Sequence, residues 1–173
     1  PLWNALAFLT TYSKIDGWDS TQENLDFEPI NPLDRWILSK LAQLIDQVRE
    51  EMDRYDLNRS VAPFVRFIDL LTNWYIRRSR RRFWKAGQGS DKLEAYATLY
   101  KVLKEFSRVI APFVPFIAEG IHLALRQPDE TQSVHLAFFP DKKEIQFRDM
   151  ELEKSMNLVL SAVTMGRALR ARY

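Results

Sequence analysis

The sequence predicts an all-α fold, an elongated helix bundle of five to six helices. Apolar residues recur at helical spacing along most of the chain, and three of the periodic segments are longer than twenty residues. Only 5 glycines occur among 173 residues, which disfavours a turn-rich all-β fold. Hydrophobic residues make up 46% of the chain, so we expect one compact domain with its own core rather than a disordered chain.

The first predicted helix covers residues 1–14 and ends before the turn signal Asp16-Gly17. Polar, irregular residues 16–30 follow and predict a surface connection. A long helix then begins near Asn31-Pro32, because Asn is a good N-cap and Pro suits the first helical position, and it ends near Tyr55-Asp56. Its apolar positions have a helical period: Leu33, Trp36, Ile37, Leu41, Leu44, Ile45, Val48 and Met52.

Asn58 or Ser60 is the predicted cap of the next helix, in which Pro63 is tolerated near the first turn. This helix runs through the basic segment Arg77–Lys85 and ends at Gly87-Gln88-Gly89. Its predicted core stripe consists of Val61, Phe64, Val65, Ile68, Leu71, Thr72 and Tyr75. The stripe predicts which side of the basic segment faces the bundle.

A fourth helix is predicted from Ser90 or Asp91, either of which can cap it, and Pro112 and Pro115 end it. A shorter fifth helix follows and contains Gly120, which costs about 1 kcal/mol relative to alanine at such a position. The fourth helix carries a long apolar stripe of Leu93, Tyr96, Leu99, Tyr100, Leu103, Phe106, Val109 and Ile110. These two helices are therefore expected to pack within the core.

Residues 127–147 form the least regular stretch, with a brief extended segment expected at Val134-His135-Leu136. The last helix is predicted from about Met150 to the end of the sequence. Because the chain begins without Met and stops inside this helical pattern, both ends are expected to be cut points within a longer protein. No internal repeat is visible.

The sequence predicts no catalytic site and no metal site. There is no cysteine, which excludes disulfides and thiolate zinc sites and fits a cytoplasmic protein. Gly87-Gln88-Gly89 is too short for a phosphate-binding loop, and it follows a helix rather than a strand. Glu119 precedes His122 at the spacing of di-iron bundles, but a single copy predicts an ordinary surface or partly packed histidine. No apolar run approaches the ~20 residues needed to cross a membrane.

One segment differs from the rest of the chain. Residues 73–85 hold five arginines and one lysine without an acid, although the formal net charge of the protein is only +2. Arginine forks bind phosphate oxygens in pairs and stack on bases. Trp74, Phe83 and Trp84 stand beside these arginines, and arginines interleaved with aromatic rings suit unpaired bases better than a smooth duplex.

Helix geometry divides the segment into two sides. Arg66, Asn73, Arg77, Arg80 and Trp84 are expected opposite the core stripe, with Arg81 beside them. We therefore expect Arg77, Arg80, Arg81 and Trp84 to face outward.

Arg78 and Arg82 continue the core stripe. They are expected to pair with carboxylates of neighbouring helices, for which Asp56, Asp69 and Glu119 are the candidate partners.

A solvated helix end is the alternative to a polyanion-binding site. The helix dipole favours cations at a C-terminus, but one or two would suffice. Six cations mixed with tryptophan and phenylalanine favour binding of nucleic acid or another polyanion. A membrane-surface helix is disfavoured, because the aromatic stripe is needed for the core.

At these residues the chain resembles a known family. The run Asn73–Trp84 is similar to the signature helix of the anticodon-binding domain of the isoleucyl-tRNA synthetases, which are class I enzymes. The resemblance covers nearly the whole chain in order. Further matching segments are Pro1–Asn4, Asn31–Ser39, Ala111–Glu119, Ser133–Leu136 and Met156–Ala168.

The matching segments differ in specificity. The junction Ala111–Glu119 is shared by the related valine, leucine and methionine enzymes, whereas the arginine-rich run is more particular to the isoleucine enzyme. Gly120 departs from the pattern, because relatives often have a second glutamate there. An anticodon-binding domain of the valine, leucine or methionine enzyme is thus one alternative, and a basic helical scaffold that docks an acidic protein is another.

The resemblance implies that residues 1–173 form one tRNA-binding helical domain, which grips the anticodon stem-loop of tRNA-Ile and catalyses nothing alone. The parent enzyme would join isoleucine to its tRNA with ATP and magnesium in a catalytic domain of the same chain, outside this sequence. No cofactor, DNA or membrane partner is expected for this part, and the family suggests a monomer. The candidate RNA-binding residues are Asn73, Trp74, Arg77, Arg80, Arg81, Trp84 and Lys85.

Overall fold

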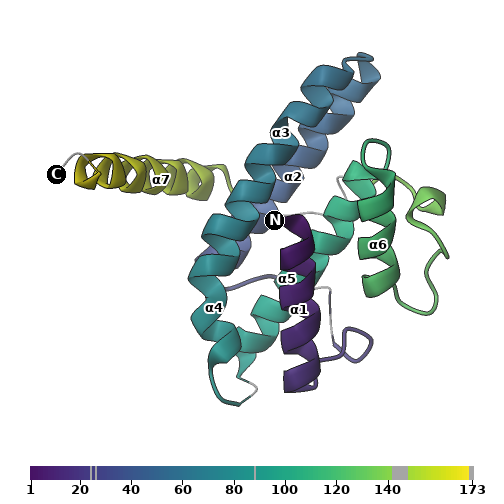
Figure 1. The fold of residues 1–173 in the computed structure, drawn as a ribbon, viewed down its shortest axis with the longest axis horizontal. Coiled ribbons are helices and arrows are strands. Elements are labelled where there is room, and N and C mark those ends of the chain that lie inside the picture. The colour runs from purple at the N-terminus through teal and green to yellow at the C-terminus, as the bar shows by residue number, and fades with distance from the viewer. Residues whose placement is uncertain (24, 26, 88, 142–147, 172–173) are drawn as a thin grey trace.

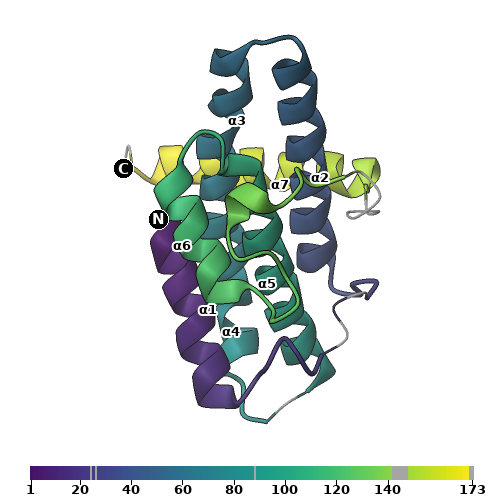
Figure 2. The ribbon, with the colours of Figure 1, turned by 90° about the vertical axis from the view of Figure 1, so that its right-hand side faces the viewer.

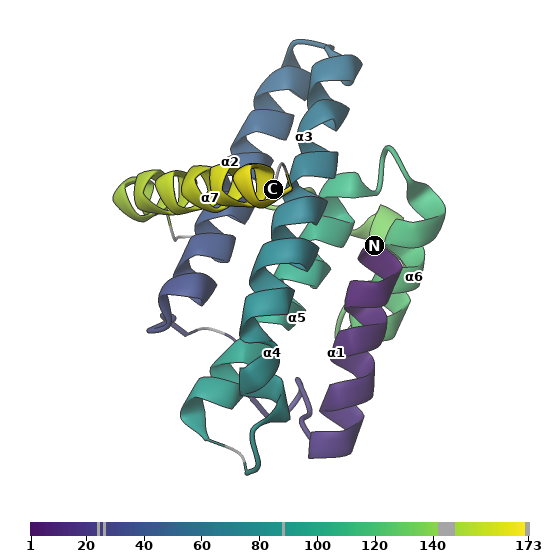
Figure 3. The ribbon, with the colours of Figure 1, turned by 60° about the vertical axis from the view of Figure 1, so that its left-hand side comes forward.

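A computed structural model describes residues 1–23, 25, 27–87, 89–141 and 148–171. All regular structure in these ranges is helical, which confirms the all-α prediction. The elements in chain order are α1 (Leu2–Asp16), α2 (Pro32–Asp53), α3 (Leu57–Asp69), η1 (Leu70–Ile76), α4 (Arg77–Trp84), α5 (Ser90–Ile110), α6 (Pro115–Leu125), η2 (Val134–Leu136) and α7 (Met150–Arg170). Helices α3 and α4 are joined through η1 into one continuous rod (Figure 3).

Helix α5 lies at the centre of the bundle and contacts α1, α2, α4 and α6 (Figures 1 and 2). Its aromatic stripe is buried as predicted, and Tyr96 is 1% exposed. Phe83, from the last turn of α4, packs edge-on against Tyr96 with ring centroids 4.9 Å apart and against Phe8 of α1 at 5.0 Å. The C-terminal end of the basic segment is therefore fixed between α1 and α5.

The predicted start of α2 is confirmed. Asn31 caps the helix, and its side-chain oxygen accepts a hydrogen bond of 3.0 Å from the backbone N–H of Leu33. Two other predicted caps are wrong. Asp56, rather than Asn58 or Ser60, caps α3 through the backbone N–H of Arg59.

Helix α5 begins after Gly89, which has no capping side chain, so Ser90 and Asp91 lie in its first turn and not at the cap. The predicted extended segment at 134–136 is also wrong. It forms the 3₁₀ turn η2, because the Ser133 hydroxyl accepts a hydrogen bond from the backbone N–H of His135 and its carbonyl accepts one from Leu136.

The π-helical element η1 changes the phase of the long rod. An i→i+5 turn holds more residues than an α-turn, so side chains after it are rotated relative to an uninterrupted α-helix. Val61 and Val65 of the predicted stripe are exposed, whereas Phe64, Leu71 and Tyr75 are buried as predicted. The buried line then continues to residues that the stripe did not include, Ser79 and Phe83.

Two contacts fix α6 in place. The Glu119 carboxylate accepts hydrogen bonds from the hydroxyl of Ser133 and from the backbone N–H of Val134. Gly120 faces Trp3 of α1 so closely that an added Cβ atom would lie 3.3 Å from the indole ring. His122 is buried rather than on the surface, and its Nε2 lies 2.9 Å from the carbonyl oxygen of Thr131.

Helix α7 projects sideways from the bundle (Figure 1), and Glu153 is its buried residue within the described part of the chain. The Glu153 carboxylate accepts a 2.5 Å hydrogen bond from the Ser39 hydroxyl and lies 3.2 Å from Lys40 Nζ on α2. Arg148 Nε donates to the same carboxylate at 2.7 Å. This cluster holds the first turns of α7 against α2.

Replacing Glu153 with glutamine is expected to lower the free energy of unfolding by about 1–2 kcal/mol at pH 7, because charge-assisted hydrogen bonds are lost. Burial raises the pKa of Glu153, but the hydrogen bonds from Ser39 and Lys40 and the nearby positive charges outweigh it, so the pKa is lowered overall. The charged Glu153 carboxylate stabilises the fold at pH values above its unfolded-state pKa of 4.5. This stabilisation is lost as the pH falls through the lower pKa of the folded state.

Denaturant unfolding of both proteins at pH 7 and pH 3 measures this effect. The difference between Glu153→Gln and the wild type should be smaller at pH 3. Glu151→Gln is the matched control, since the Glu151 side chain is 85% exposed in its ion pair with Lys154. A difference that is equal at the two pH values contradicts the role of the Glu153 charge.

Candidate nucleic-acid interface

The basic segment presents most of its cations to solvent. Five of its six cationic side chains are exposed, together with Trp84, which is 57% exposed. We call this set the arginine surface, and it consists of Arg77, Arg78, Arg80, Arg81, Trp84 and Lys85. The expectation that Arg77, Arg80, Arg81 and Trp84 face outward is confirmed, because Tyr75, Ser79 and Phe83 occupy the inward side.

The sixth cation, Arg82, points into the bundle. Its Nη1 and Nη2 donate hydrogen bonds of 2.7 and 2.6 Å to the two carboxylate oxygens of Asp34, at the start of α2. The Tyr75 hydroxyl donates to the same carboxylate at 2.8 Å, and Arg82 Nε lies 2.9 Å from a carboxylate oxygen of Asp91 on α5. Arg82 therefore ties three helices together and is not available to a ligand.

The buried position of Asp34 shifts its own pKa and that of Tyr75. The carboxylate is 0% exposed, and burial raises its pKa even though Arg82 and Tyr75 favour the charged form. Burial also raises the pKa of the Tyr75 hydroxyl, and the negative charge of Asp34 acts in the same direction. Tyr75 thus stays protonated and donates its hydrogen bond.

The prediction that Arg82 pairs with a carboxylate is confirmed, but its three candidate partners are wrong. Asp56 caps α3, Asp69 accepts a hydrogen bond from Asn73, and Glu119 binds the loop after α6. The true partner lies 48 residues away in the sequence, on a helix whose packing the sequence pattern does not reveal.

Arg78 does not pair with a carboxylate in the part of the chain that the structure describes. It is exposed, and its guanidinium carbon lies 5.3 Å from the ring centroid of Trp74. The phase change through η1 explains this difference, since Ser79 takes the inward position that the sequence pattern assigned to Arg78. A guanidinium stacked on an indole keeps its charge and its outer hydrogen-bond donors.

The side chains of the other candidate residues already make intramolecular contacts. Asn73 is exposed, but its amide nitrogen donates to Asp69 at 2.6 Å. Trp74 is half-buried and packs against the core. The indole N–H of Trp84 donates to the Tyr12 hydroxyl at 2.9 Å, which holds this exposed ring beside α1.

Two acidic side chains close to the basic segment, Asp91 and Asp16, have cationic partners. Asp91 pairs with Arg82, and Asp16 lies 2.6 Å from Lys92 Nζ. Burial raises the pKa of Asp16, but hydrogen bonds from Lys92 and Tyr96 outweigh it, so the pKa is lowered overall. These two carboxylates therefore do not neutralise the exposed arginines.

The sequence profile described as the anticodon-binding domain of tRNA ligase matches residues 34–173, most of the chain. The chain belongs to this family of anticodon-binding domains. The resemblance first seen at Asn73–Trp84 is confirmed.

Curated relatives of this anticodon-binding domain carry the name isoleucine–tRNA ligase. The protein of Treponema denticola is 48% identical over the whole of this chain, which covers 17% of that protein. Those of Protochlamydia amoebophila and Chlamydia trachomatis are 46% and 47% identical, and the chain covers 16% of each. The chain thus spans about a sixth of the length of these relatives.

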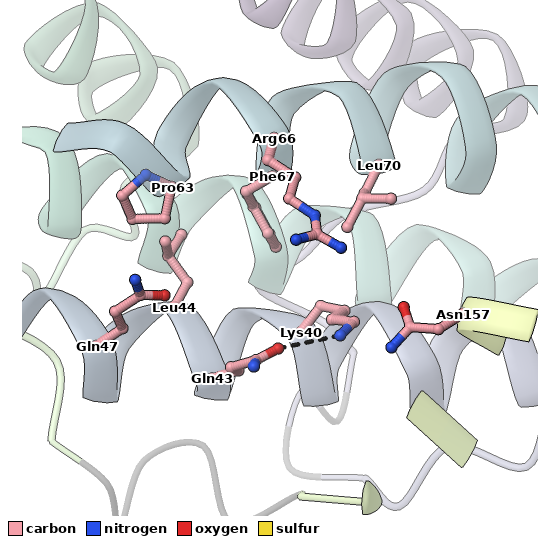
Figure 4. Close-up of a pocket in the computed structure, with 9 residues that line it drawn as sticks. All are labelled: Lys40, Gln43, Leu44, Gln47, Pro63, Arg66, Phe67, Leu70 and Asn157. Carbon is pink, nitrogen blue, oxygen red and sulfur yellow. Dashed lines mark hydrogen bonds between the residues drawn. The ribbon is translucent and has the colours of Figure 1, made fainter. Parts of the chain in front are cut away.

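A polar pocket of this anticodon-binding domain escaped the sequence analysis. It lies between α2, α3 and α7, and its lining residues are Lys40, Gln43, Leu44, Gln47, Pro63, Arg66, Phe67, Leu70 and Asn157 (Figure 4). These residues come from α2, α3, η1 and α7, and Asn157 of α7 is distant in the sequence from the others, so no local pattern connects them. Arg66, which the sequence analysis grouped with Asn73 and Arg77, instead lines this α2–α3–α7 pocket.

Among the described residues, no cluster of three or more histidine, aspartate or glutamate side chains could hold a metal ion. None of their helices is both long and apolar enough to span a membrane.

Proposed function

We propose that this chain binds the anticodon stem-loop of tRNA-Ile through the arginine surface, as the anticodon-binding part of an isoleucine–tRNA ligase. One observation carries the proposal: five exposed cations and an exposed tryptophan lie together on a chain that is nearly half identical to isoleucine–tRNA ligases. The names of the relatives favour isoleucine over valine, leucine or methionine.

The side chains support particular roles. The cations that bind phosphate oxygens or base edges are Arg77, Arg80, Arg81 and Lys85. Within the described ranges their side chains have no ion-pair partner, so their hydrogen-bond donors stay available to a ligand. Trp84 receives an unstacked base on its exposed ring face, which Tyr12 holds in position.

Asn73 and Trp74 act indirectly in this proposal. Asn73 is joined to Asp69, and Trp74 supports the Arg78 guanidinium from beneath.

The parent protein carries the chemistry. We propose that it joins isoleucine to tRNA-Ile with ATP and magnesium in a catalytic domain of the same polypeptide, acts as a monomer and works in the cytoplasm. Residues 1–173 serve as one domain, an assignment supported by the packing of α1 against α5 and α6. No step of the reaction is assigned to a residue of this chain.

Binding of the chain to tRNA-Ile and to a non-cognate tRNA across a salt series tests the proposal. We expect tighter binding to tRNA-Ile that persists at physiological salt. The slope of log affinity against log salt should be about −4, since each phosphate neutralised contributes about −0.7 to −0.9. Filter binding or fluorescence anisotropy gives both quantities.

Heparin is the control, because it supplies negative charge without bases. Equal affinity for heparin and both tRNAs, lost in parallel as salt rises, contradicts anticodon recognition. That result supports the alternative function as a basic scaffold that docks acidic partners.

A further inference from the structure

The α2–α3–α7 pocket has the composition of a nucleotide site. Its volume is about 220 Å³, and three amide side chains line it: Gln43, Gln47 and Asn157 (Figure 4). An amide offers both donors and an acceptor, which is what the edge of a nucleobase requires. The apolar wall includes Phe67 and Leu70, which suit the flat face of a heterocycle.

The polar groups of the pocket have unused hydrogen-bonding capacity. Among the described residues, none forms a hydrogen bond or ion pair with the side chains of Arg66, Gln47 or Asn157. The Gln43 carbonyl accepts a 3.0 Å bond from Lys40, which leaves the Gln43 amide nitrogen as a donor. Figure 4 shows Arg66 extending from α3 into the space above α2, with Asn157 entering from α7.

The charge of the pocket is positive. Lys40 is neutralised by Glu153, whereas Arg66 has no ion-pair partner among the described residues, and none of the residues that line the pocket is a carboxylate. An unpaired guanidinium favours a phosphate oxygen. A nucleotide carries a phosphate and a heterocyclic base joined by its sugar, so charge and shape indicate the same ligand.

The rod connects the pocket with the arginine surface. Arg66 and Leu70, which line the pocket, are followed at the same spacing of four residues by Trp74 and by Arg78 of the arginine surface. Four residues span slightly more than one turn of an α-helix but slightly less than one turn of the wider π-helical η1. The two angular offsets partly cancel, so these side chains stay on one side of the rod. The line is about 18 Å long at the rise of a helix, and Arg78 at its far end belongs to the arginine surface.

We propose that the α2–α3–α7 pocket holds one everted nucleotide of the RNA strand that the arginine surface binds. Arg66 contacts its phosphate, and the amides of Gln43, Gln47 and Asn157 contact the edge of its base. This inference rests on the proposed function, because it requires an RNA to lie along the rod. It adds α2 and α7 to the interface, neither of which carries a residue of the arginine surface.

The test uses two pocket variants of the chain and a hairpin RNA with the anticodon stem-loop sequence of tRNA-Ile. Gln47→Leu/Asn157→Leu removes base contacts while keeping side-chain size, and we expect about tenfold weaker binding with an unchanged salt slope. Arg66→Gln removes one phosphate contact and should reduce the magnitude of the slope by about 1. Circular dichroism and thermal unfolding confirm that the variants fold.

Matched controls lie outside the pocket. Gln132→Leu removes an exposed amide, and Arg126→Gln removes an exposed cation. Both should bind the hairpin within about twofold of the wild type.

NMR supplies an independent measurement. The four nucleoside monophosphates, added separately at millimolar concentration, should shift the side-chain amide signals of Gln43, Gln47 and Asn157 but not that of Gln132.

Arg80→Ala/Arg81→Ala separates the two proposals. If this variant binds the hairpin weakly while the pocket variants bind like the wild type, the pocket proposal is overturned and the proposed function stands. If Arg80→Ala/Arg81→Ala also binds like the wild type, the proposed function fails and the pocket proposal fails with it. Weak binding by both kinds of variant, with unaffected controls, supports both proposals.

Discussion

Replacing Arg82 with leucine is expected to lower the free energy of unfolding by about 3–5 kcal/mol. The change removes both hydrogen bonds from the guanidinium to Asp34 and leaves that carboxylate buried at 0% exposure. An unpaired charge in such a site costs far more than an exposed ion pair gains. Urea unfolding followed by circular dichroism measures the loss.

Arg81→Leu is the matched control, because it removes the neighbouring arginine from an exposed position. It should change stability by no more than about 0.5 kcal/mol. The double variant Arg82→Leu/Asp34→Asn should recover part of the loss, since it also removes the buried charge. Equal losses for Arg82→Leu and Arg81→Leu contradict a structural role for the Arg82–Asp34 pair.

The stability lost in the Arg82→Leu variant should depend on pH. Burial raises the folded-state pKa of Asp34 above its unfolded value of 3.8, and removal of Arg82 raises it further. Such a carboxyl group binds its proton more tightly in the folded state, so folding is favoured at low pH and becomes less favourable as pH rises through the folded pKa. The deficit of Arg82→Leu relative to the wild type should therefore be small near pH 4 and larger at pH 7.

The triple variant Arg77→Ala/Arg80→Ala/Arg81→Ala is expected to lower affinity for tRNA-Ile by roughly a hundredfold to ten-thousandfold, about 3–6 kcal/mol. Each lost hydrogen bond to a charged group contributes about 1–2 kcal/mol. The magnitude of the salt slope should fall by about 2–3, one unit or slightly less for each phosphate contact. Stability should hardly change, because all three side chains are exposed.

A second triple variant distinguishes local contacts from net charge. Arg54→Ala/Arg59→Ala/Arg126→Ala also removes three exposed arginines, and both variants change the formal net charge from +2 to −1. The second variant should bind tRNA-Ile within about tenfold of the wild type. Equal losses for the two variants would mean that tRNA responds to total charge and not to the arginine surface.

Local sequence patterns predicted the elements whose cause is local. The start of α2 depends on Asn31 and Pro32, which act within one turn. The outward position of Arg80 and Arg81 follows from their spacing to Tyr75, because the two sides of an amphipathic helix separate over a few residues. These features could be read without knowledge of the tertiary structure.

The position of Arg78 could not be predicted in this way. Helical-wheel reasoning assumes 3.6 residues per turn, and η1 breaks that assumption between Leu70 and Ile76. No glycine or proline marks the change, so the sequence carries no local signal for it. The partner of Arg82 escaped prediction for another reason, because Asp34 is buried by packing between helices that are distant in the sequence.

The α2–α3–α7 pocket was also beyond sequence reasoning. Gln43, Arg66 and Asn157 each occupy an ordinary polar position on an amphipathic helix. They meet because the ion pair between Lys40 and Glu153 holds α7 across α2. Only the crossing of the helices gives these residues a common environment.

The contact between Gly120 and Trp3 sets how closely α1 and α6 pack. An added Cβ atom at 120 would lie 3.3 Å from the indole ring, so a larger residue there requires the ring to shift by a few tenths of an ångström. Because the Trp3 side chain is 56% exposed, it can make this shift toward solvent. Position 120 can therefore hold a larger residue, as it does in many relatives, without a compensating change at position 3.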